Sequence, residues 1–133
     1  MDEEEFMELM ETDREKAKFI LMDKSYFVIN GVFNHPPFEE NYTNFAGYFV
    51  AEKNSGKLFL GMLHDVWGDS KIRGELSERV FHMIKQYGRR TPIEYNFKKA
   101  PTGLWLGEWA SKPAGKGNAV CMFKEEYVVL EHQ

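Results

Sequence analysis

Alternation of apolar and polar residues is the feature that most constrains this chain, and it begins at Ser25. In residues 92–98, for example, the apolar residues Ile93, Tyr95 and Phe97 alternate with polar ones. A period of two residues is typical of a β-strand with one buried face. Residues that favour turns interrupt the pattern about every ten positions, which predicts a series of short antiparallel strands.

These strands are expected to form a meander that closes into a barrel. Residues 45–53 and 57–67 are joined by the turn Asn54-Ser55-Gly56, and every later connection is also short, which favours an up-and-down order over a Greek key. Closure removes the exposed edges of such a sheet. The predicted fold class is mainly β (α+β by count), an eight- to nine-stranded antiparallel up-and-down barrel with one or two N-terminal helices. The expected strands are residues 26–33, 45–53, 57–67, 71–76, 80–87, 92–98, 104–110, 119–123 and 127–130, with a loop over 35–41 and turns at 68–69, 88–90 and 100–103.

One of these strands has an alternative. Residues 75–87 could also form a helix, because Leu76, Val80 and Tyr87 would then share a broad apolar arc. We favour a strand over 80–87, because the segment is rich in β-branched and aromatic residues. A helix would also leave a gap in the meander.

Residues 2–22 are expected to be helical, because they contain good helix formers and no Gly or Pro. The capping-box spacing of Thr12 and Glu15 would allow a break into two short helices. Residues 1–15 hold eight acidic residues and one basic residue, whereas the rest of the chain holds 13 acidic and 16 basic ones. We attribute this asymmetry to the preference for acids at a helix start; a nucleic-acid surface with an acidic tail is the alternative. The apolar residues at helical spacing are Phe6, Leu9, Met10, Ala17, Ile20 and Leu21.

The composition favours a single domain, residues 1–133, made of a helical segment (1–22) and a β-barrel (25–131). Apolar residues make up 43% and aromatic residues 15% of the chain, which is enough to offset the entropy lost on folding. The single cysteine, Cys121, excludes an internal disulfide, and the acidic N-terminus lacks the apolar core of a signal peptide. No apolar run approaches the roughly 18 residues of a membrane helix. We therefore expect a cytoplasmic protein without membrane association.

The stretch Gly103-x-Trp105-x-Gly107-x-Trp109 is the most distinctive motif, because it puts two glycines and two tryptophans on one face of a strand. On Gly103 and Trp105, and on the predicted meander, the chain resembles the calycin group of small β-barrels, which includes lipocalins, fatty-acid-binding proteins and avidins. The resemblance implies a barrel that holds a small, often apolar ligand. The motif lies late in this chain, whereas in lipocalins it opens the first strand, and no arginine follows Arg90 to pack on the tryptophan. No binding residue of those families is therefore carried over.

The first functional hypothesis is a small-molecule-binding barrel whose interior holds an apolar or aromatic ligand. It predicts a cavity above about 300 Å³. His64 shares a face with Leu58, and an inward histidine could anchor a ligand, act as an acid or base, or be a hydrogen-bonded buried residue. The candidate ligand-binding residues are Phe49, Leu60, Met62, His64, Tyr95, Phe97, Trp105 and Trp109.

The second hypothesis is a protein-interaction or structural module without a ligand cavity, which acts through its outer apolar face or its N-terminal helix. Residues 57–67 are apolar on both faces of the predicted strand. The face outside the barrel must therefore be covered, either by the N-terminal helix or by a second subunit in a homodimer.

No motif points to catalysis, a metal or a cofactor. There is no paired His or Cys spacing for zinc, no P-loop and no nucleophile elbow. The basic pairs Arg89-Arg90 and Lys98-Lys99 fall at opposite ends of the predicted barrel, so a nucleic-acid partner is not expected. An enzyme would need His64, or two of several carboxylates, with a shifted pKa inside the barrel, and we do not expect one. Those carboxylates are Asp65, Asp69, Glu75, Glu94 and Glu108.

Overall fold

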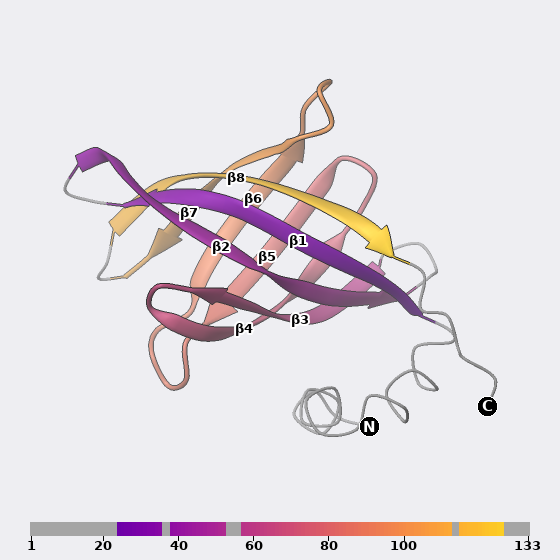
Figure 1. The fold of residues 1–133 in the computed structure, drawn as a ribbon, viewed down its shortest axis with the longest axis horizontal. Helices are drawn as coiled ribbons and strands as arrows, with labels where there is room; N and C mark the ends of the chain where they lie inside the picture. Colours follow the sequence, from indigo (N-terminus) through magenta and orange to yellow (C-terminus); the bar gives the residue numbers. More distant parts are fainter. Residues whose placement is uncertain (1–23, 36–37, 53–56, 113–114, 127–133) are drawn as a thin grey trace.

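The computed structural model describes residues 24–35, 38–52, 57–112 and 115–126, which form a closed barrel of antiparallel strands (Figure 1). Each strand pairs with the next one in the chain, and β1 pairs with β8 to close the sheet. Within these residues, no helix is long and apolar enough to cross a membrane. The strands are β1 (Lys24–His35), β2 (Phe38–Glu52), β3 (Lys57–Asp65), β4 (Gly68–Leu76), β5 (Val80–Gln86), β6 (Ile93–Lys99), β7 (Trp105–Ser111) and β8 (Gly115–Glu126).

The predicted mainly β class, the up-and-down order and the closure are confirmed, with eight strands in the barrel. The segment predicted as strand or helix is a strand, because β5 pairs with β4 on one side and with β6 on the other. The helix predicted over 2–22 and the strand predicted over 127–130 lie outside the described residues.

The loop expected over 35–41 is wrong for most of its length. β1 continues to His35 and β2 begins at Phe38, so the two strands pair along nearly their whole length. The backbone hydrogen bonds of this long ladder outweigh the weak β propensity of the polar residues within it. β8 is likewise longer than predicted, since it begins at Gly115.

The turn expected at 68–69 lies two residues earlier, at Val66-Trp67, with Asp65 paired opposite Gly68. The Asp65 carboxylate accepts a hydrogen bond from the Trp67 backbone N–H at 2.8 Å, an Asx turn that replaces the usual Asn-Gly sequence. Gly68 has a φ of 118°, a conformation that favours glycine. These two residues explain how an apolar dipeptide forms a tight turn.

The up-and-down order gives the barrel two distinct ends. β1 begins and β8 ends at the terminal end, which also carries the turns 77–79 and 100–104. The distal end carries the turns 66–67 and 87–92.

Aromatic rings fill the middle of the barrel, and Phe81 lies at their centre. Its ring centroid is 5.0 Å from those of Phe59 and Phe123, 5.5 Å from Phe49 and 6.0 Å from Trp105. Offset and tilted contacts of this kind are favoured by aromatic pairs. The buried apolar core consists of Ile29, Phe33, Phe45, Phe49, Ala51, Phe59, Leu63, Ile72, Leu76, Phe81, Met83, Tyr95, Phe97, Trp105, Trp109, Ala119 and Cys121.

Two glycines allow neighbouring strands to approach closely. A Cβ atom added at Gly61 would overlap the carbonyl oxygen of Tyr48 and the Cα of Phe49, and one added at Gly47 would overlap the carbonyl oxygen of Met62. A larger residue at either position would push two strands apart. Glycine therefore permits the strong coiling that a small closed barrel needs.

Candidate functional site

Five of the eight predicted ligand-binding residues lie inside the barrel. Phe49, Tyr95, Phe97, Trp105 and Trp109 are all buried members of the core. Their rings contact one another and other core rings, as in the stacked pair Tyr95 and Phe97, whose centroids are 5.8 Å apart. The structure brings them together as a packed aromatic core, and their role as ligand contacts stays a prediction.

The other three, Leu60, Met62 and His64, lie on the outer face of β3 and do not meet the first five. The inward residues of this strand include Phe59 and Leu63, which are buried in the core, whereas the His64 side chain is 76% exposed. Placing these three in the wall of a cavity was therefore wrong. Both alternating sets of β3 are apolar, so alternation alone does not show which set points inward.

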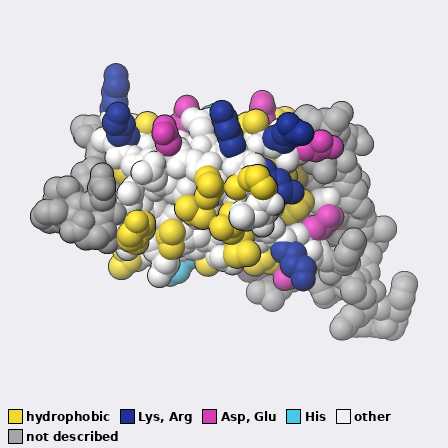
Figure 2. Space-filling view, turned by 90° about the horizontal axis from the view of Figure 1, so that it is seen from above, with side chains coloured by type: hydrophobic (Ala, Val, Ile, Leu, Met, Phe, Trp, Pro, Cys, Tyr) yellow, Lys and Arg dark blue, Asp and Glu magenta, His cyan; other side chains and the backbone are white. Residues whose placement is uncertain are grey.

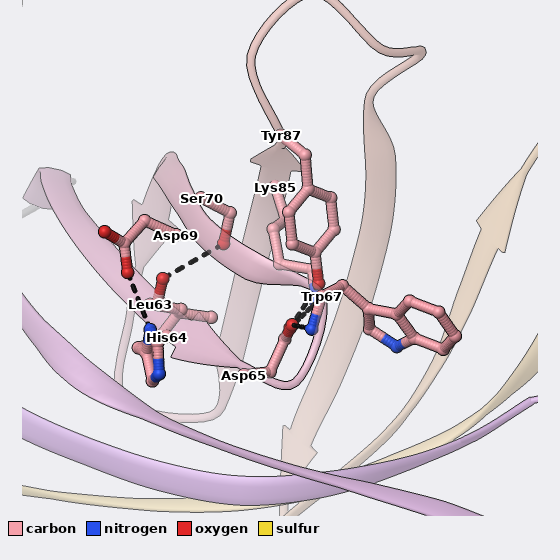
Figure 3. Close-up of polar contacts among 8 residues, drawn as sticks. All are labelled: Leu63, His64, Asp65, Trp67, Asp69, Ser70, Lys85 and Tyr87. Atoms are coloured by element: carbon pink, nitrogen blue, oxygen red, sulfur yellow. Dashed lines mark hydrogen bonds and ion pairs between the residues drawn. The ribbon is translucent and has the colours of Figure 1, made fainter.

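A polar group that was not among the predicted site residues lies inside the barrel near its distal end (Figure 3). Lys85 follows Phe81 and Met83 on the inward face of β5, and its side chain is fully buried. Its Nζ donates a hydrogen bond of 3.3 Å to Oδ2 of Asp65, whose side chain is also fully buried. The two residues form a buried ion pair between β5 and the end of β3.

Asp65 connects this ion pair to the turn between β3 and β4. Its Oδ2 also accepts a hydrogen bond from the hydroxyl of Tyr87, and its Oδ1 accepts the hydrogen bond from the backbone of Trp67. Both carboxylate oxygens therefore accept hydrogen bonds. Oδ2 accepts from the side chains of Lys85 and Tyr87, and Oδ1 accepts from the backbone of the turn. Figure 3 shows the Lys85 and Tyr87 groups converging on Asp65 while the Trp67 ring points away from it.

Four aromatic rings surround the Lys85 ammonium group. Nζ lies 4.4 Å from the ring centroid of Phe33, 4.8 Å from Tyr87, 5.3 Å from Tyr95 and 5.9 Å from Phe45. Cation–π attraction at these distances offsets part of the hydration that the ammonium loses on burial. Aromatic cages of this kind also bind ammonium ligands, but here a side chain of the protein itself occupies the cage.

Burial changes the acid–base properties of this cluster. It lowers the pKa of Lys85 to about 8, because desolvation disfavours the ammonium more than the attraction of Asp65 favours it. Burial also raises the pKa of Tyr87 and of Tyr95, and the Asp65 carboxylate adds to both shifts. The phenols therefore remain neutral donors at physiological pH. The Lys85 amine is fully buried, and its hydrogen bond to Asp65 links β5 to the end of β3.

We expect the stability of the protein to rise between about pH 8 and pH 9. The unfolded chain keeps the ordinary Lys85 pKa of 10.5, so it binds more protons in this range than the folded state does. The free energy of unfolding then increases by up to about 1.4 kcal/mol per pH unit. Above about pH 9 the trend reverses, because the thiol of Cys121, and at higher pH the phenols of Tyr87 and Tyr95, ionise in the unfolded chain and stay protonated in the folded one.

Urea unfolding at pH 8.0, 8.5 and 9.0 measures this slope, and Lys85→Met provides the control because it removes the titrating group. An equal slope in the two proteins would show that Lys85 does not cause it.

Cys121 and the pair formed by His64 and Asp69 are not part of the buried cluster. Cys121 is buried, and burial raises the pKa of its thiol, which therefore stays protonated. Oδ1 of Asp69 pairs with Nδ1 of His64 at 2.7 Å on the exposed side of the β3–β4 hairpin. Among the described residues, no three His, Cys, Asp or Glu side chains form a group that could hold a metal ion.

Apolar side chains cover much of the outer wall on one side of the barrel, and Figure 2 shows them gathered between charged residues on one face. The opposite wall, formed by β4 to β6, has charged outward residues such as Arg73, Glu94 and Lys98. The outer wall carries two apolar areas. The β8 patch consists of Leu106 of β7, Val120 and Met122 of β8, and Val28 and Val32 of β1; the β3 stripe consists of Tyr48 and Val50 of β2, and Leu58, Leu60 and Met62 of β3.

A signal for the buried ion pair was present in the sequence. In the strand predicted over 80–87, Lys85 occupies the same alternating set as Phe81 and Met83, and Asp65 shares a set with Leu63. Each of these two predicted strands therefore carries one charged residue among the apolar residues of one face, a lysine in 80–87 and an aspartate in 57–67. Reading such interruptions as a pair would have found the cluster.

Two comparisons with known proteins assign no family: no protein-family model matches the chain, and no curated protein matches it in sequence. A closed eight-stranded barrel does not itself define a function, because such folds carry many activities. The contacts and surfaces of this chain are therefore the basis for proposing its function.

Proposed function

We propose that the protein is a binding module that acts through the outer wall of its barrel, with a second copy of the chain as its partner at the β8 patch. The observation that carries this proposal is the exposure of large apolar side chains on adjacent strands, 48% for Leu106 and 50% for Met122. Val120 lies directly between them, opposite Leu106 in the β7–β8 ladder. Contiguous apolar surface of this kind marks an interaction site.

The charges that border the β8 patch favour a second copy as the partner. Lys124 lies at one end of the patch, opposite Val28, and Glu108 lies toward the other end, opposite Asn118. A two-fold axis near Cys121 would place Lys124 of one copy over Asn118 and beside Glu108 of the other, and the reverse. Among the described residues, neither Lys124 nor Glu108 forms an ion pair within the chain. The same axis would place Met122 of one copy over Val120 of the other, and Val32 over Asn30, so the outer face of β8 would be complementary to itself in polarity and charge.

Sedimentation velocity tests this proposal. We expect the wild-type protein to be dimeric at micromolar concentration and Met122→Glu to be monomeric, because the new carboxylate would be buried without a partner in the interface. Val80→Glu is the matched control, since Val80 is a 46% exposed apolar residue on β5, outside the patch. A wild-type monomer, or a dimer that persists in Met122→Glu, would contradict the proposal.

A second candidate function is the carriage of a small apolar or aromatic ligand in the manner of calycins. It is supported by the aromatic lining of the closed barrel and by the resemblance carried by Gly103 and Trp105. Such a ligand would have to displace rings around Phe81. Native mass spectrometry of the protein purified from its own host is expected to show a retained ligand mass on this hypothesis. A mass that equals the polypeptide alone would argue against carriage, and the same spectrum reports the oligomeric state.

A further inference from the structure

The β3 stripe resembles an interior surface although it faces away from the barrel. Val50 lies opposite Leu60, and Tyr48 lies opposite Met62, so these side chains form one continuous apolar strip along β2 and β3. Val50 is only 5% exposed, and Leu60 and Met62 are half-buried. An apolar strip of this length on a β-barrel normally lies against another segment.

Positive charges border the stripe on the side of β4. Arg73 lies opposite Leu60 and Lys71 lies opposite Met62 in the β3–β4 ladder, and both are exposed. Among the described residues, Arg73 forms no ion pair. A segment that fits this site should therefore combine apolar residues with a high density of acidic ones.

Residues 2–22 of the same chain have this combination. Their apolar residues recur at helical spacing, and eight acidic residues fall within positions 1–15. A helix of this length would be about 31 Å long, and β3, with nine residues, extends about 30 Å. The segment joins the barrel at Lys24, where β1 begins beside the end of β2. The tether gives it a high effective concentration at the stripe.

We propose that residues 2–22 form an amphipathic helix that packs along the β3 stripe. The helix ends near the terminal end of the barrel, where it joins β1, and its acidic N-terminal half extends toward the distal end. β4 runs from the distal to the terminal end, so Lys71 and Arg73 lie beside that acidic half. The helix leaves the β8 patch uncovered, so this inference does not depend on the proposed dimer.

Hydrogen–deuterium exchange on the full chain tests the proposal. We expect the amides of residues 2–22 to exchange at least tenfold more slowly than an unstructured peptide. Leu60→Glu should remove this protection, and Arg73→Glu should weaken it several-fold. Val80→Glu, an equivalent change on β5, should preserve it. The amides of β6 and β7 report in each variant whether the barrel is still folded.

Two results would overturn the inference. The first is exchange of residues 2–22 at the rate of an unstructured peptide in the wild type, and the second is protection that Leu60→Glu leaves unchanged. Zero-length carbodiimide cross-linking then tests the orientation. Amide links should join Lys71 to acidic residues among positions 2–15 of the same chain. A mixture of isotopically light and heavy protein distinguishes links within one chain from links between two. Intramolecular links join only light to light or heavy to heavy chains, so light–heavy links at the frequency of random pairing would overturn the intramolecular placement.

Discussion

Replacing Asp65 by alanine is expected to lower the free energy of unfolding by about 3–5 kcal/mol, the range for removing one partner of a buried ion pair. Lys85 would remain in a fully buried site without the carboxylate that raises its pKa, so it would either stay charged without a partner or lose its proton. The hydroxyl of Tyr87 and the backbone N–H of Trp67 would also lose their acceptor, and an unsatisfied donor adds to the loss. Urea unfolding at pH 7 measures the effect.

The same hairpin provides the control. Asp69 forms its ion pair with His64 on the exposed side, where both side chains are more than two-thirds accessible to water, so Asp69→Ala should change stability by at most about 1 kcal/mol. The double variant Asp65→Leu/Lys85→Met should recover most of the loss, because apolar residues of similar volume can replace a buried pair. A loss below about 1 kcal/mol in Asp65→Ala would show that the buried pair does not hold the turn.

The closed meander could be predicted because turn signals and alternation agree over most of the chain. In β6 the apolar residues Tyr95 and Phe97 are both buried, as the alternation indicates, and the turn at 100–103 is fixed by a hydrogen bond of 2.9 Å from Gly103 N to Ala100 O. Where local sequence and tertiary structure favour the same conformation, single-sequence reasoning is sufficient. The connection at 66–67 consists of Val66 and Trp67, which do not favour a turn by themselves. The side chain of Asp65 stabilises it instead.

The candidate site was harder to predict, and β3 shows the reason. Leu60 and Leu63 are equally apolar, so hydrophobicity does not distinguish the inward set of this strand from the outward one. Which set of β3 residues points inward depends on how β3 pairs with β4 and on Asp65, whose partner Lys85 lies 20 residues away in the chain. The alternation marks each of these residues as a charge within an apolar face, and the placement of β3 and β5 in the barrel shows the contact between them.

Phe81→Ala is expected to destabilise the barrel by about 3–5 kcal/mol, the usual range for truncating a buried phenylalanine. The Phe81 side chain is fully buried, and the rings around it, including Phe59 and Phe123 at 5.0 Å, are held by separate strands. Because the strands of a closed barrel cannot collapse inward independently, much of the space left by the ring should persist as a cavity. Val80→Ala is the control, since the neighbouring side chain points outward and is 46% exposed.

The same variant separates a packed core from a ligand-carrying one. An apolar cavity of this kind stays dry and binds small aromatic molecules, so a saturating concentration of benzene or indole should raise the melting temperature of Phe81→Ala, as any ligand specific for the folded state does. The wild type should show no such rise, because Phe81 already occupies the space. An equal rise in the wild type would mean that the native interior accepts aromatic guests, and it would favour the carrier function over a barrel that acts only through its outer wall.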